Sequence, residues 1–220
     1  MSLLDHLHGS YVHARRVAVL ARHVAPLLPP GGRVLDVGCG DGRLAARLRS
    51  MRSDVAIEGV DVLLRADAAI PVRQFDGAHL PYADASIDAV LLVDVLHHTD
   101  DPAVLLRESA RVARAGIIIK DHVREGVLAR PTLRAMDWVG NARHGVRLPY
   151  NYWSHAQWTD AFETIGLEVQ HWNSRLHLYP GPASWIFDRS LHFVAMLCLR
   201  ARSVTASHAG HSTRAIAAQG

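Results

Sequence analysis

Short continuous apolar runs alternate along the chain with segments whose apolar residues recur every three or four positions. The runs predict buried strands over residues 33–37, 55–60, 70–75, 86–93 and 116–120. The helical spacing predicts a first helix capped by Ser10, a second after the first strand, and a third opened by Asp101 and Pro102. Continuous apolar strands separated by helices are typical of a parallel sheet covered on both faces. We therefore expect an α/β fold.

Acidic residues follow four of the five predicted strands. They are Asp61, Asp76, Asp94 and Asp121. Ligands of parallel sheets bind at the carboxyl ends of the strands, so we expect these four carboxylates to converge on one cleft. For any one of them alone, capping of a helix or turn is the simpler interpretation. Their repetition at four strand ends favours a ligand site.

A glycine-rich turn, VLDVGCGDG, directly follows the first predicted strand. Gly38, Gly40 and Gly42 are spaced G-x-G-x-G, whereas a dinucleotide fold requires G-x-G-x-x-G. Glycines let the backbone approach a ligand closely, and the amides at the following helix start favour an anionic group. Asp36 lies two residues before the first of these glycines, where its carboxylate could accept from an ammonium group. A ligand with an amino-acid portion fits these residues better than a pyrophosphate.

Two of the strand-end acids extend this interpretation. Asp61 follows the last glycine by about 20 residues, the separation at which an acidic residue binds ribose hydroxyls in nucleoside-binding folds. Asp76 and Gly77 follow the third strand, where an acceptor could meet the exocyclic amine of adenine. An amino acid, a ribose and an adenine together describe S-adenosylmethionine.

Four motifs in order carry a family resemblance: VLDVGCGDG, GVDV, FDGAHLPYADASIDAV and LHHTDDPAVLLRESARV. They resemble the class I S-adenosylmethionine-dependent methyltransferases, especially the ubiquinone and menaquinone (type 11) group, over roughly residues 30 to 120. The resemblance implies a Rossmann-like three-layer sandwich with a seven-stranded, mostly parallel sheet and an antiparallel last strand. It assigns residues 154–166 to the penultimate helix, and 167–173 and 191–199 to the last two strands. The segment ARVARAG departs from the usual Lys-Pro-Gly-Gly turn and leaves the boundaries there open.

The resemblance also implies a set of cofactor-binding residues. Asp36, Gly38 and Gly40 would hold the methionine part, Asp61 and Val62 the ribose, Asp76 with Gly77 or Ala78 the adenine, and Asp94 and Val95 the sulfonium region. Tyr11 would close over the methionine carboxylate, or else pack as an ordinary helix-start aromatic.

Methyl transfer needs orientation and desolvation, and it needs a base only when the acceptor has a proton to lose. His97 and His98 follow the fourth strand, and Asp121 and His122 follow the fifth. Histidine titrates near neutrality and suits a hydroxyl acceptor. We favour His98 or His122 as the base and Asp121 as the orienting or substrate-binding carboxylate, with His97 packing or orienting the cofactor.

A metal site is the alternative for three of these residues. Asp94, Asp121 and His122 could hold a divalent cation, as carboxylates and an amide do in catechol-type methyltransferases. Histidine in the third place departs from that oxygen-rich pattern, so we expect no metal.

The acceptor is expected to bind under an insert over residues 122–153, which is long enough to work as a lid. Its aromatic residues, Met136 and arginines suggest a small, flat or lipophilic acceptor, with O-methylation favoured over N- and C-methylation. Coverage of the sheet edge is the alternative role for these aromatics. Residues 201–220, rich in Ala, Ser and His, are expected to be a disordered tail after one domain over residues 1–200.

Composition excludes several other classes. The net charge of +3 comes from scattered arginines and one lysine, and a nucleic-acid footprint would form a patch, so no nucleic-acid partner is expected. An RNA methyltransferase is further disfavoured because no Pro-Pro-aromatic motif follows the fourth strand. The distant Cys39 and Cys198 favour a reducing cytoplasm, and no membrane span is expected. A silent S-adenosylmethionine-binding or partner subunit is the remaining alternative, and the oligomeric state stays open.

Overall fold

The computed structural model describes residues 3–141, 149–179, 181, 184, 187 and 190–200, with side chains from residue 13 onward except at 139–141. The expected tail and the side chain of Tyr11 lie outside this described part. No helix within it is long and apolar enough to cross a membrane.

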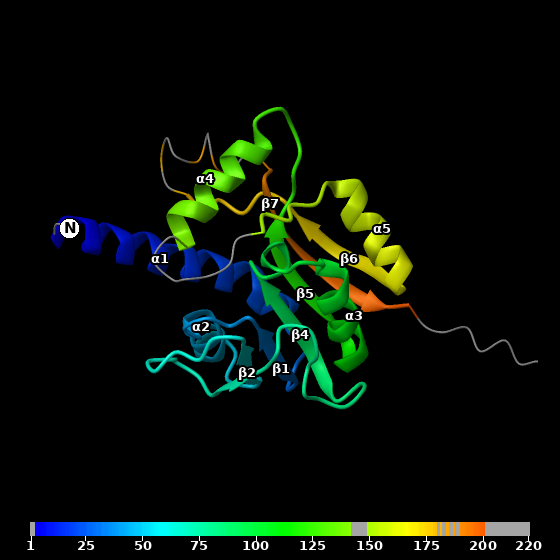
Figure 1. Cartoon of the computed structure of the whole chain (residues 1–220). Helices are drawn as coiled ribbons and strands as arrows, with labels where there is room; N and C mark the ends of the chain where they lie inside the picture. The colour runs from blue at the N-terminus through cyan, green and yellow to red at the C-terminus, as the bar shows by residue number, and fades with distance from the viewer. Residues whose placement is uncertain are drawn as a thin grey trace, which may run out of the picture.

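A single seven-stranded sheet forms the centre of the fold, in the order β3-β2-β1-β4-β5-β7-β6 (Figure 1). The strands are β1 (Arg33–Val37), β2 (Ala56–Asp61), β3 (Val72–Gln74), β4 (Ile87–Val93), β5 (Ala113–His122), β6 (Leu167–Asn173) and β7 (His192–Leu199). β1 to β5 pair in parallel, and β7 pairs antiparallel with both β5 and β6. The expected mostly parallel sheet with an antiparallel last strand is confirmed.

Helices cover both faces of the sheet, which confirms the three layers (Figure 1). The helices are α1 (Leu3–Val24), α2 (Arg43–Met51), α3 (Pro102–Val112), α4 (Ala129–Asn141) and α5 (His155–Ile165). α1 and α2 share one apolar cluster with Val34 and Leu91, whereas α3 and α5 share another with Leu35 and Val90. Neighbouring residues of one strand face opposite sides, so each strand contributes to both clusters.

Local signals explain where two of the helices begin. Asp101 caps α3 by accepting from the Ala103 amide at 2.9 Å, and Pro102 occupies its first position. Ser154 and Gln157 form a capping box at the start of α5. The expected cap of α1 at Ser10 is wrong, because α1 already begins at Leu3 and Ser10 lies inside it.

The fifth strand is longer than the apolar run that predicts it. α3 passes directly into β5 at Ala113, so the segment ARVARAG supplies strand residues instead of a turn. At the other end, Asp121 and His122 still pair with Phe193 and His192 of β7. The antiparallel neighbour therefore holds the two candidate site residues in a rigid strand.

Close packing of β5 against β7 requires a glycine. A Cβ atom at Gly116 would overlap the carbonyl oxygen of Leu197 and lie 2.9 Å from the Met196 side chain. We expect Gly116→Ala to lower the free energy of unfolding by about 2 kcal/mol, as overpacking does. Gly126→Ala is the control, because its Cβ meets nothing within 4 Å and only its positive φ opposes the change. Urea unfolding of both variants measures the difference, and an equal loss in the two would contradict the steric explanation.

Candidate functional site

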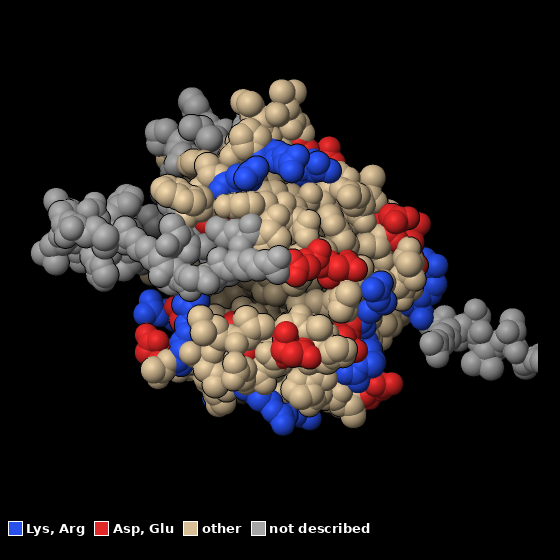
Figure 2. Space-filling model, in the orientation of Figure 1, with Lys and Arg blue, Asp and Glu red and all other residues tan. Residues whose placement is uncertain are grey.

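The candidate site lies where β1, β2, β4 and β5 end. The face of the molecule drawn in Figure 2 is hollowed below a band of arginines that runs over α4. α4 itself lies beyond the carboxyl ends of β4 and β5 (Figure 1). The residues that follow β4 therefore lie beside the insert, which His97 contacts through Asp137 and Tyr152.

The glycine-rich turn has the backbone that its sequence predicts. Gly38 and Gly40 have φ values of 69° and 58°, a left-handed conformation that favours glycine. A Cβ at Gly38 would lie 2.5 Å from the Val95 side chain, which follows β4. The Asp61 carboxylate accepts from the Gly40 amide at 2.8 Å and from the Leu63 amide at 2.9 Å. Asp61 thus ties the end of β2 to the turn after β1.

Asp36 is a buried carboxyl group at the end of β1, with 3% of its surface exposed. Burial, followed by the nearby charges of Asp61 and Asp41, raises the pKa of Asp36 to about 7. A cationic ligand group beside it would favour the ionised form. The environment of Asp36 therefore fits the ammonium group that the sequence predicts there.

The third acidic position forms an exposed turn. The Asp76 carboxylate accepts from the amides of Ala78 and His79 at 2.8 Å and 2.6 Å, and these bonds lower its pKa to about 2. Gly77 has a φ of 89°, and a Cβ there would lie 3.2 Å from Val62. The Val62 side chain is 54% exposed. These neighbouring residues form one open edge of the site.

A cluster of opposite charges fills the space at the end of β4. The Asp94 carboxylate contacts the guanidinium of Arg16 on α1 and the ammonium of Lys120 on β5. Burial raises the pKa of Asp94, but the two cations outweigh it and hold this pKa well below its ordinary value. Lys120 is the one lysine of the chain, is fully buried, and lies 3.4 Å from His192 Nδ1. Asp94 also has a φ of 56°, a strained backbone for a non-glycine residue.

Asp121 is paired most closely with His97. Its Oδ1 atom lies 2.6 Å from His97 Nδ1 and 3.3 Å from His122 Nδ1, and its Oδ2 atom accepts from the Leu96 amide at 3.1 Å. His97 and Asp121 are each 1% exposed. Burial opposes ionisation of Asp121, but His97 and His122 outweigh it, so its pKa is lowered. Among the contacts of Asp121, the one with His97 is therefore the closest.

The pKa values of two neighbouring histidines, His98 and His122, are lowered, whereas that of His97 is raised. Burial, then the neighbouring His97, lowers the pKa of His98 to about 4, and burial, then Lys120 and His97, lowers that of His122 to about 4. Both imidazoles are therefore neutral at neutral pH. His98 Nδ1 is buried and has no hydrogen-bond partner in the described part of the chain.

The insert supplies a carboxylate that sequence reasoning missed. Asp137 of α4 places Oδ2 3.4 Å from His97 Nε2 and accepts from the hydroxyl of Tyr152. Asp137 is 6% exposed and Tyr152 is 5% exposed. The helical spacing of Leu133 and Met136 beside it signals an inward face of α4, although the sequence gives no indication that His97 lies opposite. Arg16 and Lys120 were missed for the same reason.

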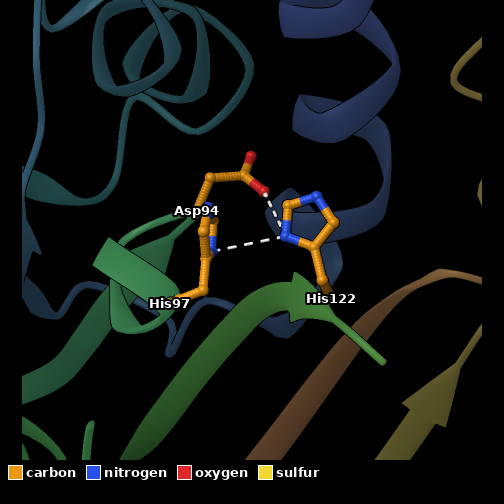
Figure 3. A group of neighbouring side chains, drawn as sticks. All are labelled: Asp94, His97 and His122. Atoms are coloured by element: carbon orange, nitrogen blue, oxygen red, sulfur yellow. Dashed lines mark hydrogen bonds and ion pairs between the residues drawn. The ribbon is translucent and has the colours of Figure 1, made fainter. Parts of the chain in front are cut away.

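Two groups of three donor atoms in the described residues lie close enough to hold a metal ion, and His97 belongs to both. One group is His97, His98 and Asp137; the other is Asp94, His97 and His122, whose donor atoms lie within 4.8 Å of one another (Figure 3). His122 Nδ1 is 3.3 Å from His97 Nδ1 and 3.8 Å from Asp94 Oδ1. Asp94, the one carboxylate of this second group, is also engaged by the side chains of Arg16 and Lys120. The pairing of Asp94 with these two cationic side chains is thus sufficient to explain its burial here without a bound metal ion.

Comparisons with known proteins agree with this geometry. The pattern of a methyltransferase domain family matches residues 10–171. The chain is 31% identical over 140 residues to 27-O-demethylrifamycin SV methyltransferase of Amycolatopsis mediterranei, covering 52% of this chain and 51% of that protein. It is 34% identical over 128 residues to demethylmenaquinone methyltransferase of Roseiflexus sp., covering 54% and 53%. The chain thus spans about half the length of these curated relatives.

Solved structures share the fold at lower identity. A Thermotoga maritima S-adenosylmethionine-dependent methyltransferase, a possible histamine N-methyltransferase, superposes with a TM-score of 0.59 at 21% identity, covering 89% of this chain and 95% of its own. A [4+2]-cyclase superposes with a TM-score of 0.61 at 21% identity, covering 82% and 80%. Because the family pattern spans most of the chain, the chain belongs to the methyltransferase domain family, whose members are enzymes that use S-adenosylmethionine as their cofactor.

Proposed function

We propose that this chain transfers a methyl group from S-adenosylmethionine to a hydroxyl group of a small aromatic or lipophilic acceptor. The observation that carries the proposal is the buried pair of His97 and Asp121, with 2.6 Å between Nδ1 and Oδ1, at adjacent strand ends beside the glycine turn. A histidine oriented by a carboxylate suits an acceptor that must lose a proton. The rifamycin relative is named for an O-demethylated substrate, which supports the same choice of acceptor atom.

The residues around the glycine turn fit the cofactor. Gly40 leaves its backbone open to a ligand, because a Cβ there would meet only the end of the Arg65 side chain at 3.9 Å, whereas the glycine at position 38 lets Val95 pack against the turn. Asp36 offers a buried carboxylate to an ammonium group. Each oxygen of Asp61 receives one amide and keeps a lone pair for a ribose hydroxyl. Val62, Gly77 and Ala78 would line the adenine. We assign Val95 to the sulfonium region and leave Tyr11 as a candidate for the methionine carboxylate.

The bound cofactor supplies the methyl group and a neutral thioether as leaving group. The protein must then exclude water, hold the acceptor in line and receive its proton. Asp121 keeps His97 Nδ1 protonated, so Nε2 is the atom that can receive the acceptor proton. The sequence favours His98 or His122 for this step, whereas the 2.6 Å contact favours His97. His98, neutral and partly exposed, is the second candidate.

A binding protein without methyl transfer is the competing function. The observation in its favour is the [4+2]-cyclase, which shares this fold and is named for another reaction. We favour a small-molecule partner over nucleic acid because two of the relatives are methyltransferases named for small acceptors, a demethylrifamycin and a demethylmenaquinone. We place the protein in the cytoplasm, since Cys39 and Cys198 are both free thiols.

The first prediction concerns Asp36. Its pKa is raised from 3.8 to about 7 by burial, then by Asp61 and Asp41, so its ionisation destabilises the fold as pH rises through this range. We expect Asp36→Asn to raise the free energy of unfolding at pH 8 by about 2 kcal/mol without cofactor, and to change little at pH 4. The same variant loses at least about tenfold in affinity for S-adenosylhomocysteine, because the charge facing the ammonium is gone.

Urea unfolding and isothermal titration calorimetry measure these two effects. Asp160→Asn, on the exposed surface of α5, is the matched control and is expected to change neither quantity. Loss of affinity without a gain in stability would mean that Asp36 is not a buried ionisable group. Unchanged affinity would remove Asp36 from the cofactor site.

The second prediction separates the candidate bases. We expect transfer of a labelled methyl group in a screen of phenols, hydroquinones and hydroxylated lipids. His97→Gln and Asp121→Asn are expected to lower turnover by about 100-fold or more while S-adenosylhomocysteine still binds. A loss confined to His98→Gln or His122→Gln would transfer the role to that residue. Binding of S-adenosylhomocysteine with no transfer to any hydroxyl compound, together with transfer to amines, would refute O-methylation.

A further inference from the structure

The insert forms a small apolar core of its own above the site. Ala129 and Leu133 of α4 pack with Tyr152 and Leu191, and Met136 lies against them. This cluster is separate from the two clusters that hold the helices to the sheet. α4 can therefore move with little disturbance of the main core, as the covering elements of active sites do.

One polar contact joins this separate cluster to the candidate base. Asp137 Oδ2 lies 3.4 Å from His97 Nε2, on the side of the ring opposite to Asp121. The carboxylate is steadied by the hydroxyl of Tyr152, whose ring stacks on His97 with 5.7 Å between centroids. Both nitrogens of His97 therefore face carboxylates, and the nitrogen needed for proton transfer faces the one from α4.

Charged and titratable groups surround His97 from several elements. β4 and the turn after it supply Asp94 and His98, and β5 supplies Lys120, Asp121 and His122. The insert supplies Asp137 on α4 and Tyr152 after it. Burial lowers the pKa of His97, but Asp121 and Asp137 outweigh it and raise this pKa to about 10. An imidazolium has no lone pair to receive a proton. In the observed arrangement His97 is therefore correctly oriented but not yet a base.

We propose that Asp137 is a positioning residue of the acceptor site. In the observed structure its carboxylate lies against Nε2 of His97, and when α4 moves away the acceptor hydroxyl takes that position next to Nε2. This inference rests on the proposed function, because it concerns His97, the residue proposed there as the base. The Tyr152 phenol, which donates to Asp137, lies beside the same imidazole. The region near Nε2 of His97 thus already holds one phenolic hydroxyl, that of Tyr152, bound to the same carboxylate oxygen. Figure 3 shows His122 and Asp94 beside His97, with His122 Nδ1 3.3 Å from His97 Nδ1.

Histidine nitrogen NMR on the full chain tests the proposal, with S-adenosylhomocysteine absent and present. In wild type, His97 is expected to stay protonated up to about pH 10. Asp137→Asn keeps the shape of the side chain but removes its charge, so it should lower the titration midpoint of His97 by about one pH unit or more. Tyr152→Phe is the matched control, because it removes the hydroxyl and leaves the carboxylate on His97. It should move the midpoint less, and His79 on its remote exposed turn should not change in either variant.

Hydrogen exchange supplies a second measurement that needs no acceptor. Backbone amides of α4 from Thr132 to Trp138 should exchange at least about threefold faster in Asp137→Asn than in wild type, because the tether to His97 is weakened. Amides of α5 serve as the internal reference. An unchanged His97 midpoint in Asp137→Asn would overturn the proposal, and so would unchanged exchange in α4.

The outcomes for the two proposals can be told apart. If wild type does not bind S-adenosylhomocysteine, the proposed function fails, while the His97 titration still decides whether Asp137 controls the imidazole. If S-adenosylhomocysteine binds and Asp137→Asn leaves the titration midpoint of His97 unchanged, the proposed function stands and Asp137 is only a packing residue. Thermal melting of each variant shows whether it has folded, and Tyr152→Phe keeps the exchange comparison available if Asp137→Asn does not fold.

Discussion

Balanced burial of charge at the carboxyl ends of β4 and β5 is the constraint on which the site depends. An unpaired carboxylate at such depth would cost several kcal/mol. Asp94 is matched by Arg16 and Lys120, and Asp121 is matched by His97. Arg16 comes from α1, Lys120 from β5, and His97 from the short 3-10 helix (Leu96–His98) that follows β4. The docking of the first helix and the pairing of the central strands are therefore part of the same electrostatic balance.

Asp36 is the exception that points to function. It is nearly as buried as Asp121, yet burial and neighbouring carboxylates raise its pKa, whereas cations lower the pKa values of Asp94 and Asp121. A carboxyl group left with unfavourable neighbours reduces the stability of the empty protein. Such groups are common where a ligand later supplies the missing charge. On the proposed function, the stability lost at the end of β1 is exchanged for affinity toward the cofactor.

Most of the fold can be predicted from the chain because parallel strands are continuous apolar runs, and the acids that follow them must share one edge. That reasoning places Asp61, Asp94 and Asp121 correctly at strand ends. It does not find Lys120 as a buried residue, since a lysine after GIII is expected to reach water. It does not find Asp137 either, because the contact with His97 joins residues 40 positions apart through an insert with no strand pattern.

The placement of Asp137 has a consequence for how such a domain can change its acceptor. The pair of His97 and Asp121 belongs to rigid strand ends, whereas Asp137 belongs to a helix with its own small core. A change of sequence in α4 can therefore alter both the shape of the acceptor site and the proton affinity of His97 without disturbing the cofactor residues. On the proposed arrangement, His97 becomes a base only when its Nε2 proton has left with the departing Asp137 carboxylate or to water, and an acceptor hydroxyl has taken that position.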